Sequence, residues 1–189
     1  MENHMKVLII NAHPDLESFT TSISNKIYET HLAKGHDVTL LNLASIDFEI
    51  SFKGYSDREK IDTLEADLES AQKQIKKSDH IIITTPIWWS TYPAILKGFF
   101  DRTLLPGFAF KFHKGKMVQE KLLTGKTAEL VLLSDALAWY RRYLLKDPAA
   151  TILKRDILGF CGIKVKKVHR IGSVGSLDAE ARERVIKTF

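Results

Sequence analysis

The sequence predicts an α/β protein built on a doubly wound, five-stranded parallel sheet with helices on both faces. Two observations carry this prediction: strand-like and helix-like segments alternate, and the strand-like segments include continuous apolar runs, as in strands buried on both faces. The 189 residues suit one domain over residues 1–189, with residues 1–5 as a candidate disordered leader. A content of 44% hydrophobic and 27% charged residues is typical of a globular protein.

The first half of the chain contains two strand–helix units. The β-branched apolar run Lys6–Ala12 predicts the first strand, and apolar residues at helical spacing predict a helix from Ser18 to Gly35. Asp37–Leu43 is the second predicted strand, and an irregular segment over Ala44–Arg58 follows it. A polar segment with one apolar stripe predicts a helix over Glu59–Lys77.

The second half continues the alternation with three more strands and three more helices. The strand His80–Thr85 is the most strand-like stretch of the chain and ends at Pro86, and Pro93 supplies a proline for the first turn of the next helix. In chain order, the predicted elements are the strand His80–Thr85, the helix Pro93–Leu104, the strand Thr127–Leu133, the helix Ala149–Leu158, the strand Lys164–Ile171 and the helix Ala179–Phe189.

Five such strands suit the flavodoxin-like order 2-1-3-4-5. In this arrangement ligands bind beyond the carboxyl ends of the strands, near the switch between strands one and three. The loops at that point are His13–Ser18 and Pro86–Tyr92, so we expect the functional site between them.

The first of these loops, AHPDLESFT, carries hydroxyls but neither of the two familiar glycine-rich phosphate motifs. Ser18, Thr20 and Thr21 lie at the start of a helix, where free N–H groups and the helix dipole favour a phosphate, and His13 adds a donor. Simple capping of the helix by Ser18 would alone justify the serine, and this loop taken by itself favours capping.

The second loop is aromatic. A flat three-ring cofactor such as a flavin needs an apolar wall and backbone donors along its edge. Pro86 fixes the exit of the chain, Trp88 and Trp89 can form the wall, and N–H groups from Ile87 onward can face the ring. The alternative is that both tryptophans fill a core or a subunit contact.

Charge, cysteine content and the N-terminus exclude several classes of protein. The lone Cys161 permits no internal disulfide or multi-cysteine metal site, we predict no metal, and its apolar neighbours favour a buried, inert thiol. The net charge of +5 includes a basic stretch at 164–170 that alternates like a half-exposed edge strand, so we predict no nucleic-acid binding. No signal sequence or bilayer-length apolar run is present, so we expect a cytoplasmic protein without membrane insertion.

Four stretches, LIINAHPDLESF, PIWWSTYPAILKGFFDR, LPGFAF and LGFCGI, together resemble the flavodoxin-like NAD(P)H:quinone oxidoreductases over nearly the whole chain. The resemblance implies a homodimer with its sites at the subunit boundary. It assigns binding of the flavin phosphate to His13, Ser18, Phe19 and Thr20. It assigns binding of the isoalloxazine ring to Pro86, Ile87, Trp88 and Trp89. Closure of the site from across that boundary is assigned to Phe108, Phe110 and Phe112. One buried face of an extended segment also explains the alternating phenylalanines.

The implied reaction is ping-pong hydride transfer from NADH or NADPH through the flavin to a quinone or similar acceptor, with Trp89 walling the substrate site. We expect FMN rather than FAD, because no long extension beyond Phe189 covers an adenosine. The chain departs from the family at 134–145, SDALAWYRRYLL, where a glycine-rich loop followed by tyrosine and histidine is usual. Here Trp139 is the substrate-binding candidate, and Tyr140 or Asp135 the proton-transfer candidate; helix packing explains them about as well.

Other functions fit the same fold. An azo or nitro compound could replace the quinone as acceptor. Relatives of this family also serve as flavin-binding ancillary subunits of ion-efflux systems on the cytoplasmic side. A one-electron carrier shares the fold, but such carriers are typically acidic, unlike this chain at +5.

Overall fold

The computed structural model describes residues 4–54 and 64–189. Its central element is a five-stranded sheet of order β2-β1-β3-β6-β7, in which every neighbouring pair is parallel. The strands are β1 Lys6–Asn11, β2 Asp37–Asn42, β3 His80–Pro86, β6 Thr127–Leu133 and β7 Lys164–Ile171. The predicted order 2-1-3-4-5 is therefore confirmed.

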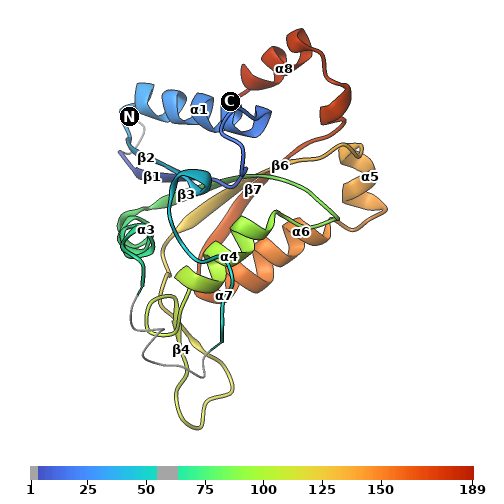
Figure 1. Cartoon of the computed structure of the whole chain (residues 1–189). Helices are drawn as coiled ribbons and strands as arrows, with labels where there is room; N and C mark the ends of the chain where they lie inside the picture. The colour runs from blue at the N-terminus through green and yellow to red at the C-terminus, as the bar shows by residue number, and fades with distance from the viewer. Residues whose placement is uncertain (1–3, 55–63) are drawn as a thin grey trace.

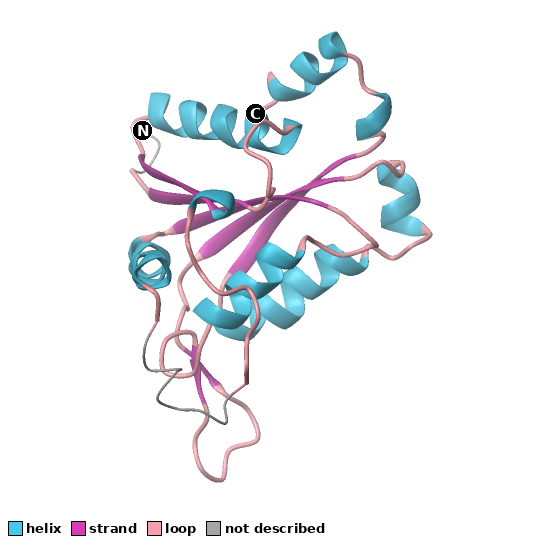
Figure 2. Ribbon diagram, in the orientation of Figure 1, coloured by secondary structure: helices cyan, strands magenta, loops and turns pink. Residues whose placement is uncertain are grey.

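Two apolar clusters cover the two faces of this sheet because successive strand residues point to opposite sides. Leu8 and Ile10 of β1 belong to the larger cluster, together with residues of the helices α3 (Ala66–Lys77), α4 (Ala94–Thr103), α6 (Pro148–Thr151) and α7 (Gly159–Cys161). Val7 and Ile9 belong to the smaller cluster, with residues of α1 (Phe19–Ala33) and α8 (Ala179–Ile186). Figure 1 shows α1 and α8 on one face and α4, α6 and α7 on the other, and Figure 2 shows the sheet between these layers.

Helices α1 and α4 begin within one residue of their predicted starts, whereas α3 begins later than predicted. Helix α1, Phe19–Ala33, is capped by Ser18, and α4, Ala94–Thr103, has Pro93 at its N-cap rather than inside its first turn. Helix α3 spans Ala66–Lys77. The helix predicted from Glu59 therefore begins later, at Ala66, and residues 59–63 lie outside the described part of the chain.

The helical segment before β7 is longer than predicted. It runs through α6 Pro148–Thr151, the π-helical turn η2 Ile152–Leu158 and α7 Gly159–Cys161. The sequence placed its end before the glycines, but it stops at Gly162, whose φ of 102° allows the left-handed turn that ends it. The last helix, α8 Ala179–Ile186, ends earlier than Phe189.

Two short features were not assigned from the sequence. The strands β4 Phe110–Lys111 and β5 Glu120–Lys121 pair antiparallel at the base of an arm that projects from the body of the molecule (Figure 1). Helix α5, Ala138–Tyr143, follows β6. Among the described residues, no helix is long and apolar enough to cross a bilayer.

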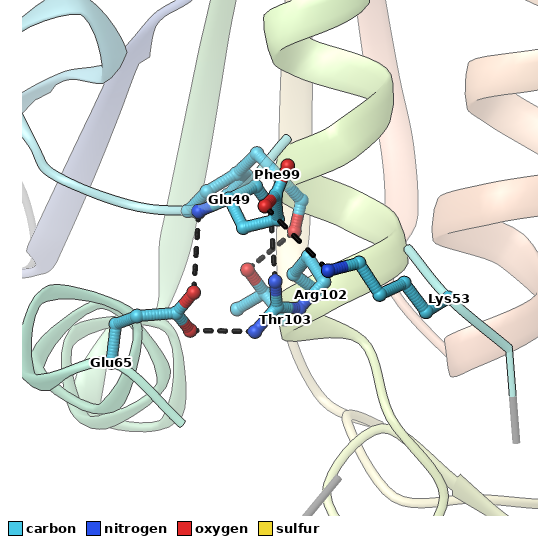
Figure 3. A network of polar contacts seen from close by, with 6 residues as sticks. All are labelled: Glu49, Lys53, Glu65, Phe99, Arg102 and Thr103. Atoms are coloured by element: carbon cyan, nitrogen blue, oxygen red, sulfur yellow. Dashed lines mark hydrogen bonds and ion pairs between the residues drawn. The ribbon is translucent and has the colours of Figure 1, made fainter. Parts of the chain in front are cut away.

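A polar network ties the segment after β2 to helix α4 (Figure 3). Arg102 donates to the Glu49 carbonyl at 3.0 Å and to the Glu65 carboxylate at 2.6 Å, while the Glu49 N–H also reaches the Glu65 carboxylate. Burial alone would raise the pKa of Glu65, but hydrogen bonds from backbone N–H groups and Arg102 hold it below its usual value. This network holds the segment around Glu49 against α4 and against the start of α3.

Candidate functional site

A cleft of about 230 Å³ opens at the carboxyl ends of β1, β3 and β6. Both loops that the sequence placed at the switch point contribute to it. The cleft is lined by residues at or beyond the carboxyl ends of β1, β3, β6 and β7, including the start of α1, and by one residue of α8: His13, Ser18, Phe19, Thr20, Pro86, Ile87, Trp88, Leu133, Ser134, Asp135, Val174 and Arg182. Of the eight predicted cofactor-binding residues, only Trp89 is not in this lining.

The start of α1 presents unused hydrogen-bond donors to the cleft. Ser18 Oγ accepts the Thr21 N–H at 3.2 Å and so caps the helix. The N–H groups of Phe19 and Thr20 make no hydrogen bond within the described residues, and neither does the Thr20 hydroxyl. Free amides at a helix N-terminus are an anion-binding arrangement, so capping by Ser18 and anion binding are compatible here.

His13 presents its Nε2 atom as a donor. Its Nδ1 lies 3.0 Å from the Asp15 N–H and 3.1 Å from the Asp15 carbonyl. That carbonyl already accepts from Ser18 and Thr21, whereas the Asp15 N–H has no other acceptor, so Nδ1 accepts and Nε2 carries the proton. Burial lowers the pKa of His13 and so favours the neutral ring, although Asp15 acts in the opposite direction.

The buried side chain of Asn11 hydrogen-bonds to three segments beside the cleft. Its Nδ2 donates to Thr21 Oγ1 and to Asn42 Oδ1, both at 2.9 Å, and its Oδ1 accepts the His13 N–H at 3.3 Å. A side chain that joins α1, β2 and the His13 loop fixes their relative positions.

Arg182 brings a positive charge to the cleft from α8, far away in the sequence. Its guanidinium lies 5.5 Å from the centre of the Phe19 ring, and its buried Nε has no hydrogen-bond partner in the described structure. An unpaired buried donor is costly, and an anion at the α1 N-terminus would satisfy it. The sequence did not predict this residue, because a lone arginine in a polar helix carries no signal that separates it from Arg184.

The aromatic loop is a tight turn. Trp88 and Thr91 exchange both backbone hydrogen bonds, at 2.8 and 3.0 Å, around Trp89 and Ser90. Those two residues have φ values of 51° and 62°, a left-handed conformation normally left to glycine or asparagine. Backbone strain of this kind is characteristic of functional sites.

This turn corrects one expectation about the backbone donors. The Ile87 N–H donates to the Leu133 carbonyl at 2.7 Å and the Trp88 N–H is used in the turn, so neither is free for a ring. Within the turn Trp88–Thr91, the amides without a hydrogen bond are those of Trp89 and Ser90. The Trp88 ring packs edge-on against His13, with centroids 5.7 Å apart, while Trp89 is 100% exposed.

The predicted substrate-binding residues lie apart from the cleft within one chain. Phe108 is half-buried and packs on the core, and Phe110 is buried with its ring 5.0 Å from that of Phe160. Phe112 and Trp139 are exposed, and so is Tyr140, whose ring centroid lies 6.1 Å from that of Trp139. None of these five lines the cleft.

Cys161 is buried, and burial raises the pKa of its thiol to about 11. The thiol is therefore protonated at neutral pH, which agrees with the inert role expected from its neighbours.

Comparisons with known proteins agree with this fold. A family model described as a flavodoxin-like fold matches residues 5–188. Ribosyldihydronicotinamide dehydrogenase (quinone) of Mus musculus is 33% identical over 186 residues, which cover 85% of this chain and 78% of the relative. An uncharacterized NAD(P)H oxidoreductase of Haemophilus influenzae is 28% identical over 97% of this chain and 91% of its own. A crystal structure from Streptococcus mutans has a TM-score of 0.83 at 29% identity, covering 97% and 96% of the two chains.

Proposed function

We propose that this chain is a flavin-dependent enzyme, because it belongs to the flavodoxin-like family of NAD(P)H:quinone oxidoreductases. It would transfer two electrons from NADH or NADPH to a quinone or a similar small acceptor in a ping-pong reaction. The observation that carries this proposal is a cleft whose lining combines unused hydrogen-bond donors with the apolar side chains of Pro86, Ile87 and Trp88.

The residues of the cleft fit a flavin phosphate. The lining residues supply five unused donors: the free N–H groups of Phe19 and Thr20, the Thr20 hydroxyl, His13 Nε2–H and the unpaired Arg182 Nε. The three terminal oxygens of a phosphate monoester can accept several such bonds at once. We propose FMN, because these donors suit a terminal phosphate dianion.

A bound flavin would supply the two-electron chemistry. The chain would position the flavin, exclude water from it and place charged groups beside it. Trp88 and Pro86 would hold the ring by apolar contact, and Trp89 would lie at the mouth, where a nicotinamide or an acceptor enters. Tyr140 and Asp135 are the groups after β6 that could hold or move a proton, and only Asp135 lines the cleft.

The distribution of aromatic side chains supports a homodimer. Trp89, Phe112 and Trp139 are exposed in the single chain, and large exposed apolar surface marks an interface. Phe110 is already committed to its own core, so Phe112 is the phenylalanine of GFAFKF best placed to close the site of a second copy.

The first test is direct reconstitution. Protein incubated with FMN, FAD or riboflavin is desalted, and the retained flavin is titrated anaerobically with NADH or NADPH and then with a quinone. We expect FMN to be retained, its absorbance to bleach with the nicotinamide and to return with the quinone. Loss of all three flavins on desalting would contradict the proposal.

The phosphate end of the cleft is tested with Ser18→Asp. Aspartate caps a helix as well as serine does, so the stability of the protein should not change. The added negative charge should weaken FMN binding by at least about tenfold through repulsion of the phosphate. Riboflavin, which has no phosphate, is the matched ligand and should bind both proteins equally. Equal loss of FMN and riboflavin binding would contradict the placement of the phosphate.

The aromatic end is tested with Trp89→Ala. This variant should slow hydride transfer more than it loosens the flavin, since the exposed Trp89 follows the lining residue Trp88 but does not itself line the cleft. Stopped-flow reduction and the dissociation constant of FMN separate the two effects. Equal turnover and affinity in the Ser18 and Trp89 variants would refute this division of roles.

A further inference from the structure

Asp135 places a carboxylate on the wall of the cleft. It is the second residue after β6, and it is the only acidic side chain among the described residues that line the cleft. His13 and Arg182 line the same cleft as donors, so a negative charge at this position opposes the electrostatic character of the rest of the site.

The carboxylate is held in place by the backbone of the segment after β7. The Gly175 N–H donates to Asp135 Oδ1 at 2.7 Å. The Ser134 N–H donates to the Ile171 carbonyl at 2.9 Å, and the Val174 N–H donates to the Ser134 carbonyl at 3.2 Å. A Cβ at Gly175 would lie 3.0 Å from Asp135 Oδ1, so glycine permits the close approach.

The charge of Asp135 is not neutralised by the protein. Within residues 4–54 and 64–189, Asp135 forms no ion pair, and the only hydrogen bond to its side chain is the one from Gly175. Arg182, the cation that lines the same cleft, lies over the Phe19 ring. Asp135 is exposed, so solvent screens part of its charge, but no cation of the protein cancels the field that it exerts in the cleft.

We propose that Asp135 sets the reduction potential of the flavin by disfavouring negative charge on the reduced ring. This inference rests on the proposed function. A bound flavin would accept two electrons and one proton with the hydride of the nicotinamide, so its reduced ring would carry a negative charge unless it took up a second proton. The Asp135 carboxylate would make that charge less stable, lower the tendency of the flavin to accept electrons and favour uptake of the second proton.

The size of the effect follows from the shared lining of the cleft. Asp135 lines the same cleft of about 230 Å³ as Pro86, Ile87 and Trp88, the residues proposed to hold the flavin ring. At the effective dielectric of a partly open site, removing one such charge should change the reduction equilibrium by about tenfold. For a two-electron couple, tenfold corresponds to about 30 mV.

The test is a spectroscopic measurement of the midpoint potential of the FMN-loaded protein against a reference dye at pH 7. Asp135→Asn removes the charge and keeps an acceptor for Gly175, and Asp135→Ser removes it with a different shape. Glu180→Gln is the matched control, because Glu180 is an exposed carboxylate on α8 that does not line the cleft. Thermal unfolding of each protein shows that it is folded.

We expect both Asp135 variants to shift the equilibrium about tenfold toward reduced flavin and the Glu180 variant to match the wild type. A shift below about twofold in the Asp135 variants, or an equal shift in Glu180→Gln, overturns the inference. Slower turnover with an unchanged potential also overturns it and assigns Asp135 to proton transfer. A wild type that retains no flavin overturns the proposed function and this inference together, whereas a flavin-loaded wild type with an unresponsive potential overturns the inference alone.

Discussion

Replacement of Arg182 by methionine tests the most unexpected feature of the cleft. The buried Nε of Arg182 has no hydrogen-bond partner in the described structure, and the guanidinium packs on Phe19. Methionine retains most of the apolar contact of the side chain and removes both the charge and the unsatisfied donor. The substitution should therefore affect ligand binding and stability of the ligand-free protein in different ways.

The magnitudes follow from the two contacts. A hydrogen bond from a charged donor to a phosphate contributes roughly 1.5–3 kcal/mol, which is about 10- to 100-fold in the dissociation constant of FMN. In the ligand-free protein, relief of an unsatisfied buried donor is worth roughly 1–3 kcal/mol, against a loss of about 0.5–1 kcal/mol for the contact with Phe19. The ligand-free variant should be at least as stable as the wild type.

The assay combines fluorescence titration of FMN with urea denaturation of the ligand-free protein. Arg184→Met is the control, because Arg184 lies on the same helix but is exposed and pairs with Glu180 at 2.8 Å. Riboflavin should bind all three proteins alike. An FMN dissociation constant within twofold of wild type for Arg182→Met, or an equal loss for Arg184→Met, would refute the role of Arg182 as a phosphate contact.

Three further predictions concern stability. Asp147 is buried between Arg170, at 2.6 Å, and Arg141, at 3.9 Å, so Asp147→Asn should lower the free energy of unfolding by about 3–5 kcal/mol, measured by urea denaturation, by leaving buried charges unpaired; a loss under about 1 kcal/mol would contradict this. Ser90→Gly should raise the urea midpoint by relieving left-handed strain of about 1 kcal/mol, and a lower midpoint would argue against strain. Burial lowers the pKa of His80 below 6.5, although the carboxylate of Glu129 on β6 acts in the opposite direction. The unfolded chain therefore binds more protons than the folded one, and the free energy of unfolding should fall as the pH drops from 6.5 toward the pKa of His80 in the folded protein. The loss between pH 7.5 and 5.5 should be smaller in His80→Gln, and an equal loss would assign the effect to other groups.

The sequence by itself determined the architecture, because burial on both faces leaves a local record. Apolar runs such as Thr127–Leu133 and Lys6–Asn11 could only be strands of a covered parallel sheet, and β6 and β7 have the predicted bounds. The ends of the helices were predicted less accurately. The segment before β7 contains a π-helical turn and continues through Gly159, and no residue pattern indicates either feature. Short elements such as α5 and the β4–β5 pair are held by tertiary contacts, and they too were missed.

The same division applies to the cleft. The two loops at the switch point were found from strand order alone, because parallel strands bring their carboxyl ends to one edge. Only the tertiary structure placed Arg182 and Val174 beside His13, used the Trp88 N–H in a turn and left Asp135 without a counter-ion. These facts depend on distances between residues far apart in the chain, and on which donors the fold has already consumed, so no local pattern in the sequence records them.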